Sequence, residues 1–267
     1  MSNRNRFTSS TSSNPFLNVE HMQSTQSQIL HNEERNVFNR NDIYATEGSM
    51  TVQGAVNKTL ILTGLLLITA VIAWQMATPA LMWIGVIGGL IAALVAYMKP
   101  NTANITAPLY AIFEGLALGT ISLMVAASFG EGFFGIVTNA IFLTIFALLA
   151  MLGAYKTGLI KPTEKFKSII FTATGAIAVL YLVSMLLGLF GINIPYLHEG
   201  GVIGIGISLV IVGIAALNLI IDFESFEVGE KMGASKKTEW LCALGLLVTL
   251  VWLYMEILRL LSKINRD

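Results

Sequence analysis

Apolar residues fall into seven long blocks along the chain, and polar residues gather between the blocks. The blocks cover residues 59–77, 80–98, 107–127, 133–154, 168–190, 201–221 and 239–261. Each has about 20 residues, the length that an α-helix needs to cross ~30 Å of hydrocarbon. None shows the two-residue alternation of a membrane β-strand. The pattern therefore predicts an all-α membrane protein, with a seven-transmembrane-helix bundle over residues 51–267.

The first 50 residues have a different composition. They are rich in Ser, Thr, Asn and Gln, and they lack the apolar central region of a secretory signal. Such a segment cannot bury enough apolar surface to fold by itself. We expect residues 1–50 to form a polar, disordered tail on the cytoplasmic side.

The overall composition agrees with a membrane protein. Hydrophobic residues make up 55% of the chain and charged residues 12%, about half the usual charged share of a soluble domain. The lipid bilayer is therefore an expected partner. The net charge is zero and the basic residues are spread along the chain, so no nucleic-acid partner is expected. The single cysteine, Cys242, lies in an apolar block, where we expect a buried and inert thiol.

Basic residues predict the orientation in the membrane. With the N-terminus in the cytoplasm, 13 of the 16 Lys and Arg residues lie on the cytoplasmic side, as the positive-inside rule requires. The other three, Arg259, Lys263 and Arg266, follow the last block and would lie outside. An alternative is a re-entrant last block, but its apolar run is continuous and contains no proline, which favours seven full spans.

Three carboxylates in or beside the blocks are candidates for function. Glu114 is about seven residues into the third, Asp222 closes the sixth, and Glu256 is near the outer end of the seventh. An ionisable residue in hydrocarbon is costly and is by default a functional candidate. Glu114 and Asp222 share the cytoplasmic third of the bilayer. Such carboxylates can hold a proton or make a transient contact with a hard cation such as calcium.

Each carboxylate also has a structural interpretation. Glu114 could bond to the backbone of a neighbouring helix, and Asp222 could be a solvated residue at a helix end. Glu256 is at helical spacing from Thr249, Trp252 and Arg259, so it could pair with Arg259 near the outer interface. Glycine pairs four residues apart, at 85/89 and 115/119, indicate close packing of helices within the spans.

Motifs for several enzyme classes are absent from the sequence. There is no Walker motif, no dinucleotide fingerprint, no HExxH and no GxSxG. The last block contains no lysine that could carry a retinal. We therefore expect no enzymatic activity and no cofactor.

Three segments, in order, resemble the Bax inhibitor-1 family of seven-helix membrane proteins, and most of all its bacterial branch. They are AIFEGLALGTIS in the third block, LNLIIDFESFEVG at the end of the sixth, and MEILRLL in the last. The resemblance covers about residues 50–267. It implies a bundle with the last helix central, and a calcium leak that is governed by pH.

The resemblance also implies functional residues. In the family, an Asp at the end of the sixth span and a second Asp midway along the seventh form a proton-sensing pair. Asp222 matches the first position, whereas the second falls on Thr249, which cannot share a proton as a carboxylate does. Arg259 resembles a family arginine that pairs with an acidic residue in an open state. Our hypothesis is that Glu114 supplies the missing carboxylate from another helix.

The sequence thus predicts a pH-sensitive calcium-leak channel or transporter of the bacterial inner membrane, gated by Asp222 and Glu114. Calcium is the expected transported ion and is expected to contact these two carboxylates. Two alternatives stay open: a non-conducting regulatory or interaction protein of the stress response, and a proton-coupled carrier of an unknown solute.

Overall fold

The computed structural model describes residues 48–130, 135–191 and 201–266. The chain divides into two units, Met1–Gly48 and Ser49–Asp267, and the helices of the described residues lie in the second. The tail expected over 1–50 lies outside the described residues up to position 47. Its last two residues, Ser49 and Met50, belong to the helical unit, and the side chain of Met50 is buried there.

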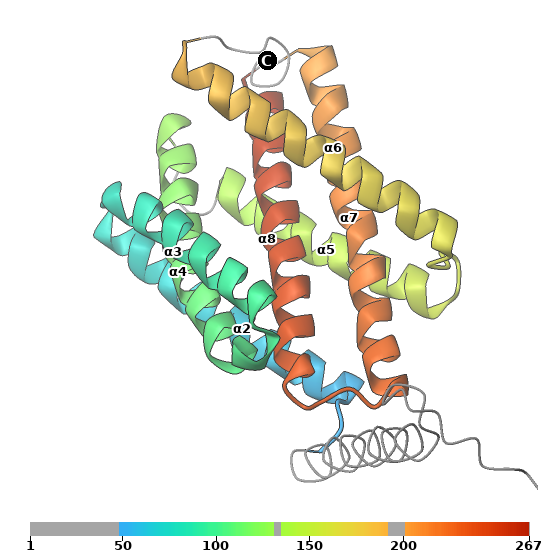
Figure 1. The fold of residues 1–267 in the computed structure, drawn as a ribbon. Helices are drawn as coiled ribbons and strands as arrows, with labels where there is room; N and C mark the ends of the chain where they lie inside the picture. Colours follow the sequence, from blue (N-terminus) through green and yellow to red (C-terminus); the bar gives the residue numbers. More distant parts are fainter. Residues whose placement is uncertain (1–47, 131–134, 192–200, 267) are drawn as a thin grey trace, which may run out of the picture. The chain divides into compact units, whose positions relative to one another are not determined.

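Seven helices of the described chain are long and apolar enough to cross a membrane, and the all-α fold class is confirmed (Figure 1). The helices are α2 (Val52–Met76), α3 (Ala80–Met98), α4 (Ala103–Ser128), α5 (Ile136–Lys156), α6 (Glu164–Leu189), α7 (Val202–Lys231) and α8 (Thr238–Ile264), and a short 3-10 turn, η2 (Pro100–Thr102), precedes α4. Each apolar block of the sequence corresponds to one of these helices.

Two helices extend well beyond the apolar blocks. Helix α2 begins at Val52 rather than 59, because the Thr51 side chain caps it by accepting a hydrogen bond from the Gly54 amide at 2.9 Å. Helix α7 runs on to Lys231, and Lys231 pairs with Glu227 one turn earlier at 3.3 Å. Asp222 therefore lies inside a helix and not at its end.

Small residues bring α2, α3 and α4 into close contact. A Cβ atom on Gly119 of α4 would lie only 2.8 Å from the Cα of Ala70 in α2, and Gly115 is packed equally tightly against the same helix. A Cβ on Gly85 of α3 would lie 2.6 Å from the backbone nitrogen of Ala117 in α4. The backbones can approach this closely only because these positions lack side chains, as the glycine spacing predicts.

Helix α8 takes part in both hydrophobic cores. Leu244 and Leu247 pack with α2, α3 and α4, whereas Leu253 and Leu258 pack with α5 and α7. Of the seven spans, α8 has the largest buried share, 56%. It packs along α2, α4, α5 and α7, and Tyr181 connects it to α6. Figure 1 shows α8 passing between α2, α3 and α4 on one side and α7 on the other.

The bundle has two ends. We call the end where α2 and α8 begin and α7 ends the proximal end, and the end where α7 begins and α8 ends the distal end (Figure 1). Polar side chains on α8 contact neighbouring helices at both ends and between them.

Candidate functional site

Asp222 projects from the interior of α7, two turns before its proximal end. Its helix neighbours Leu219 and Phe223 are buried. The Oδ2 atom of Asp222 is shielded from solvent, and no residue of the described chain donates a hydrogen bond to it. An unpaired buried carboxylate oxygen is costly, because it loses its water and gains no donor in return. The interpretation of Asp222 as a solvated helix end does not fit this environment.

Helix α8 provides the surface opposite Asp222. The Oδ1 atom lies 3.8 Å from the position that a Cβ on Gly245 would take, so the absence of a side chain there leaves room for the carboxylate. The hydroxyl of Thr249, one turn further on, lies beside the carboxylate, and it also donates to the Gly245 carbonyl at 3.3 Å. Cys242, which is partly buried, is the next polar group along this face of α8. The structure thus brings Asp222 and Thr249 together.

Glu114 belongs to a different helix contact. Its Oε2 atom lies 2.8 Å from the position of a Cβ on Gly89, so it is packed against α3. Its charge acts on Tyr110, one turn earlier on α4. Asp222, by contrast, faces Gly245 of α8. The two carboxylates therefore lie at separate interfaces, α3–α4 and α7–α8.

A buried polar cluster at the distal end joins α6 to α8. Glu256 is 1% exposed, and the Tyr181 hydroxyl lies 2.9 Å from both of its carboxylate oxygens. Trp252 donates its indole N–H to Glu256 at 3.3 Å, and Arg259 donates to the two oxygens at 3.1 and 3.2 Å. Arg259 also donates to the Tyr181 hydroxyl and lies over its ring, 4.7 Å from the centroid. Thr249 is not part of this cluster, since it faces Asp222.

Sequence reasoning does not single out Lys263, which lies one turn beyond the Glu256 cluster. The residue is 4% exposed, and its ammonium group donates to the Gly204 carbonyl at 3.0 Å and to the Ser208 hydroxyl at 2.9 Å. Both acceptors are in the first turns of α7. The small residues at 204 and 208, spaced four apart, are the only sequence signal for this contact.

Glu239 is a second residue that sequence reasoning misses. It is fully buried at the proximal start of α8, where it forms ion pairs with Lys58 and Lys236. In the sequence it is the first residue of the last apolar block and follows Lys236 and Lys237 closely, so it looks like part of a charged helix end. Its burial could not be foreseen, because the partner Lys58 is far away in the chain.

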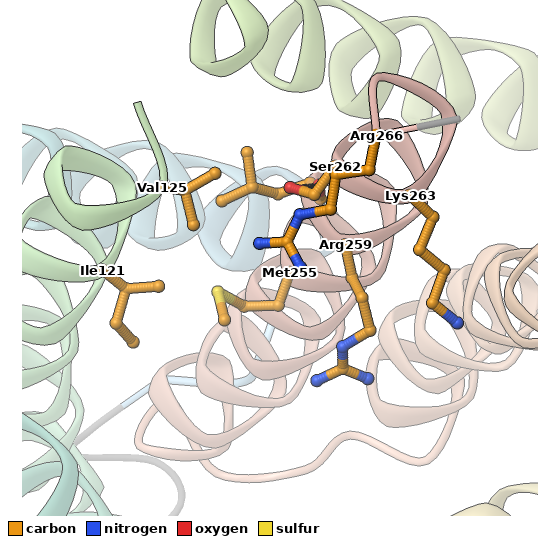
Figure 2. A pocket seen from close by; sticks show the side chains of 8 residues that line it. Ile121, Val125, Met255, Arg259, Ser262, Lys263 and Arg266 are labelled. Atoms are coloured by element: carbon orange, nitrogen blue, oxygen red, sulfur yellow. Dashed lines mark hydrogen bonds between the residues drawn. The ribbon is translucent and has the colours of Figure 1, made fainter. Parts of the chain in front are cut away.

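A cavity of about 210 Å³ opens between α4 and α8 at the distal end (Figure 2). Its lining is Ile121, Val125, Met255, Leu258, Arg259, Ser262, Lys263 and Arg266. The basic side chains among these repel cations, and neither Asp222 nor Glu114 lines the cavity. It is therefore a poor match to a cation site.

No three His, Cys, Asp or Glu side chains gather closely enough to hold a metal ion within residues 48–130, 135–191 and 201–266. A resident metal centre needs such a set of ligands. The calcium contact at Asp222 and Glu114 remains a prediction, and each of these carboxylates could supply only part of a coordination shell.

Comparison with known proteins identifies the family. The family model for Bax inhibitor 1 like proteins matches residues 14–266, nearly the whole chain. No curated protein and no solved structure matches the chain. The seven apolar helices and the family match agree with the resemblance carried by the segments around Glu114, Asp222 and Glu256. The chain is a multi-pass integral membrane protein that belongs to the Bax inhibitor 1 like family.

Proposed function

We propose that the protein is a calcium-leak channel or transporter whose flux depends on pH, with Asp222 as the gating group. The observation that carries the proposal is the Oδ2 atom of Asp222, buried and without a donor at the α7–α8 contact. A carboxyl group in such a place can hold a proton in one state and attract a hard cation in the other. Family membership supports the same activity.

The gate works through the fit between α7 and α8. A neutral carboxyl group can stay packed against Gly245 and Thr249. An ionised one needs water, a donor or a cation, and Thr249 supplies at most one hydrogen bond. Gaining or losing the proton therefore changes the relative free energy of a packed and a separated arrangement of the two helices. The Glu256–Arg259 cluster closes the distal end and acts as the outer gate.

The proximal end faces the cytoplasm of a bacterial cell, and the membrane is the inner membrane. The support is the position of the lysines in the described part of the chain. Those that flank or join the helices at the proximal end are Lys58, Lys99, Lys156, Lys161, Lys165, Lys167, Lys231, Lys236 and Lys237. An excess of basic residues marks the cytoplasmic side. In this orientation Asp222 is reached from the cytoplasm.

The test is calcium flux into liposomes that contain the purified protein, measured at about pH 6 and about pH 8. Carboxyl groups in strongly perturbed environments can titrate within this pH range. Wild type is expected to show different fluxes at the two values. Asp222→Asn is expected to give equal fluxes, because the amide keeps the shape and cannot ionise. Glu227→Gln, which changes a partly exposed carboxylate of the same helix, is the control and should behave as wild type. An undiminished pH dependence in Asp222→Asn would refute the gating role.

Glu114→Gln tests the second carboxylate in the same assay. If Glu114 shares the sensing role, its amide variant reduces the pH dependence even though it lies on the α3–α4 contact. A pH dependence identical to that of wild type rules out a role for Glu114 in sensing and leaves Asp222 as the single titrating group.

Two other functions are distinguished by the same liposomes. A non-conducting regulatory protein gives no calcium flux at either pH. A proton-coupled carrier gives proton movement that depends on an added solute and is indifferent to calcium. For both, Asp222 and Glu114 would be polar contacts between helices. Neither enzymatic activity nor a cofactor is part of any of these proposals.

A further inference from the structure

The short segment Ser49–Val52, which leads into the first residue of α2, is bonded to the proximal ends of α7 and α8. The Met50 amide donates to the carbonyl of Ala234 at 2.7 Å, and Ser49 forms an antiparallel bridge with Ser235. Ala234 and Ser235 lie in the connection that joins α7 to α8. The segment therefore contacts the turn between the two helices that form the Asp222 site.

The same segment also contacts α7 directly. The Val52 amide donates to the Glu230 carboxylate at 3.0 Å. The Met50 side chain is 1% exposed, and its sulfur would lie only 2.6 Å from a Cβ on Gly229. Gly229 thus leaves the space that the methionine fills. One polar and one apolar contact hold the segment against the last two turns of α7.

Glu239 holds the segment to α8. Its Oε1 atom accepts hydrogen bonds from the Thr51 amide at 2.9 Å and from the Thr51 hydroxyl at 3.3 Å. Its Oε2 atom is ion-paired with Lys58 in the second turn of α2, and Lys236 lies 3.5 Å from Oε1. The carboxylate is fully buried, so each of these partners offsets the cost of removing its charge from water.

Gly54 makes room for this carboxylate. A Cβ on Gly54 would overlap all three atoms of the Glu239 carboxyl group, with Oε2 only 2.5 Å away and Cδ and Oε1 closer still. Even one methyl group at position 54 would therefore displace the Glu239 side chain. Alanine is otherwise a better helix former than glycine, so the effect of such a change is steric.

The segment lies roughly two to three helical turns from the Asp222 site along both helices. Glu230 follows Asp222 by about 12 Å on α7, and Glu239 precedes Thr249 by about 15 Å on α8, at 1.5 Å per residue. Because the segment joins the two helices on the proximal side of Asp222, separating them at Asp222 strains or breaks its bonds.

We infer that Ser49–Val52 is a latch that holds the proximal ends of α7 and α8 together and keeps Asp222 against Thr249, with Glu239 as its positioning residue. This inference rests on the proposed function for its effect on flux, but the latch itself is a property of the fold.

Hydrogen exchange tests the latch without reference to transport. The amides of residues 50–52 should be protected in wild type, since all three donate to α7, α8 or their connection. In Gly54→Ala they should exchange about tenfold faster or more, the change produced by about 1.4 kcal/mol. The matched control is Gly64→Ala on the same helix, where a Cβ meets no atom within 4 Å. Equal exchange in the two variants overturns the latch.

The flux assay then tests the coupling. Gly54→Ala should shift the pH profile of calcium flux, whereas Gly64→Ala should leave it unchanged. A purely structural role for Glu239 would lower the yield or stability and leave the pH profile in place. Glu239→Gln is the second variant: it keeps the shape, removes the ion pair with Lys58, and should shift the profile in the same direction.

The outcomes separate the two proposals. Faster exchange in Gly54→Ala with an unchanged pH profile overturns the coupling and leaves the role of Asp222 intact. No calcium flux in wild type overturns the proposed function, while the exchange result still decides whether the latch exists. A profile that shifts in Gly54→Ala together with faster exchange at residues 50–52 supports both.

Discussion

The contact between α2 and α4 gives the sharpest test of the packing. We predict that Gly119→Ala destabilises the protein relative to Gly64→Ala. At Gly119, the new Cβ would lie 2.8 Å from both the Cα and the carbonyl carbon of Ala70, and still closer to its oxygen. These are backbone atoms of a helix and cannot rotate away. At Gly64, a Cβ meets nothing within 4 Å.

The comparison isolates the steric cost. Both substitutions gain the same helix propensity, up to about 1 kcal/mol, so this gain cancels in the difference between them. Ordinary carbon contacts are about 3.5–4.0 Å, so α2 and α4 must move apart by roughly 1 Å at Gly119. Forcing extra atoms into a packed interface costs about 1–3 kcal/mol, and rigid backbone neighbours favour the upper half of that range.

We therefore expect Gly119→Ala to be about 2–3 kcal/mol less stable than Gly64→Ala. The assay is unfolding in mixed micelles with both variants in the same detergent, followed by circular dichroism. In a thermal scan the difference corresponds to about 5–10 °C in the midpoint. Equal midpoints would show that α2 and α4 do not approach each other closely at Gly119. The inference of close helix packing from the glycine spacing would then be refuted.

Two tyrosines on different helices provide further tests of the bonds to α8. Tyr181→Phe should lower stability by about 1–2 kcal/mol, because Glu256 loses a donor in a buried site; thermal unfolding measures the change. Tyr254→Phe should cost about 1 kcal/mol, because its hydroxyl is 2.7 Å from that of Ser122 on α4, and the same scan reports it. Tyr97→Phe is the control for both, since Tyr97 is 83% exposed; a loss of stability there equal to the others would contradict the assignment.

The number and order of the helices could be predicted from the sequence because each helix corresponds to one continuous apolar block that is long enough to cross the membrane. The ends of the helices could not. Helix α7 continues to Lys231 through charged residues, and a hydropathy pattern cannot distinguish a solvated helix from a loop. For the same reason Asp222 looked like a terminal residue, although it lies within the helix and has one buried oxygen.

Contacts within one helix were also easier to predict than contacts between helices. Glu256 and Arg259 are three residues apart, so helical geometry is enough to bring them together. The proximity of Asp222 to Thr249 followed from the family resemblance, and Glu114 lies elsewhere because depth alone does not specify which helix faces which. Glu239 and Lys263 were missed because their partners, at positions 58 and 208, are distant in the sequence.

Helix α8 carries polar bonds to four other helices at five levels. Glu239 is bound near its start, Thr249 lies beside Asp222, Tyr254 is bound to α4, and Glu256 and Lys263 are bound near its end. A shift of α8 by one turn, about 5.4 Å, exceeds the ~3.5 Å limit of a hydrogen bond at every level simultaneously. An axial movement of that size would have to break the bonds at all five levels together, which favours a few discrete positions of this helix over a continuous range.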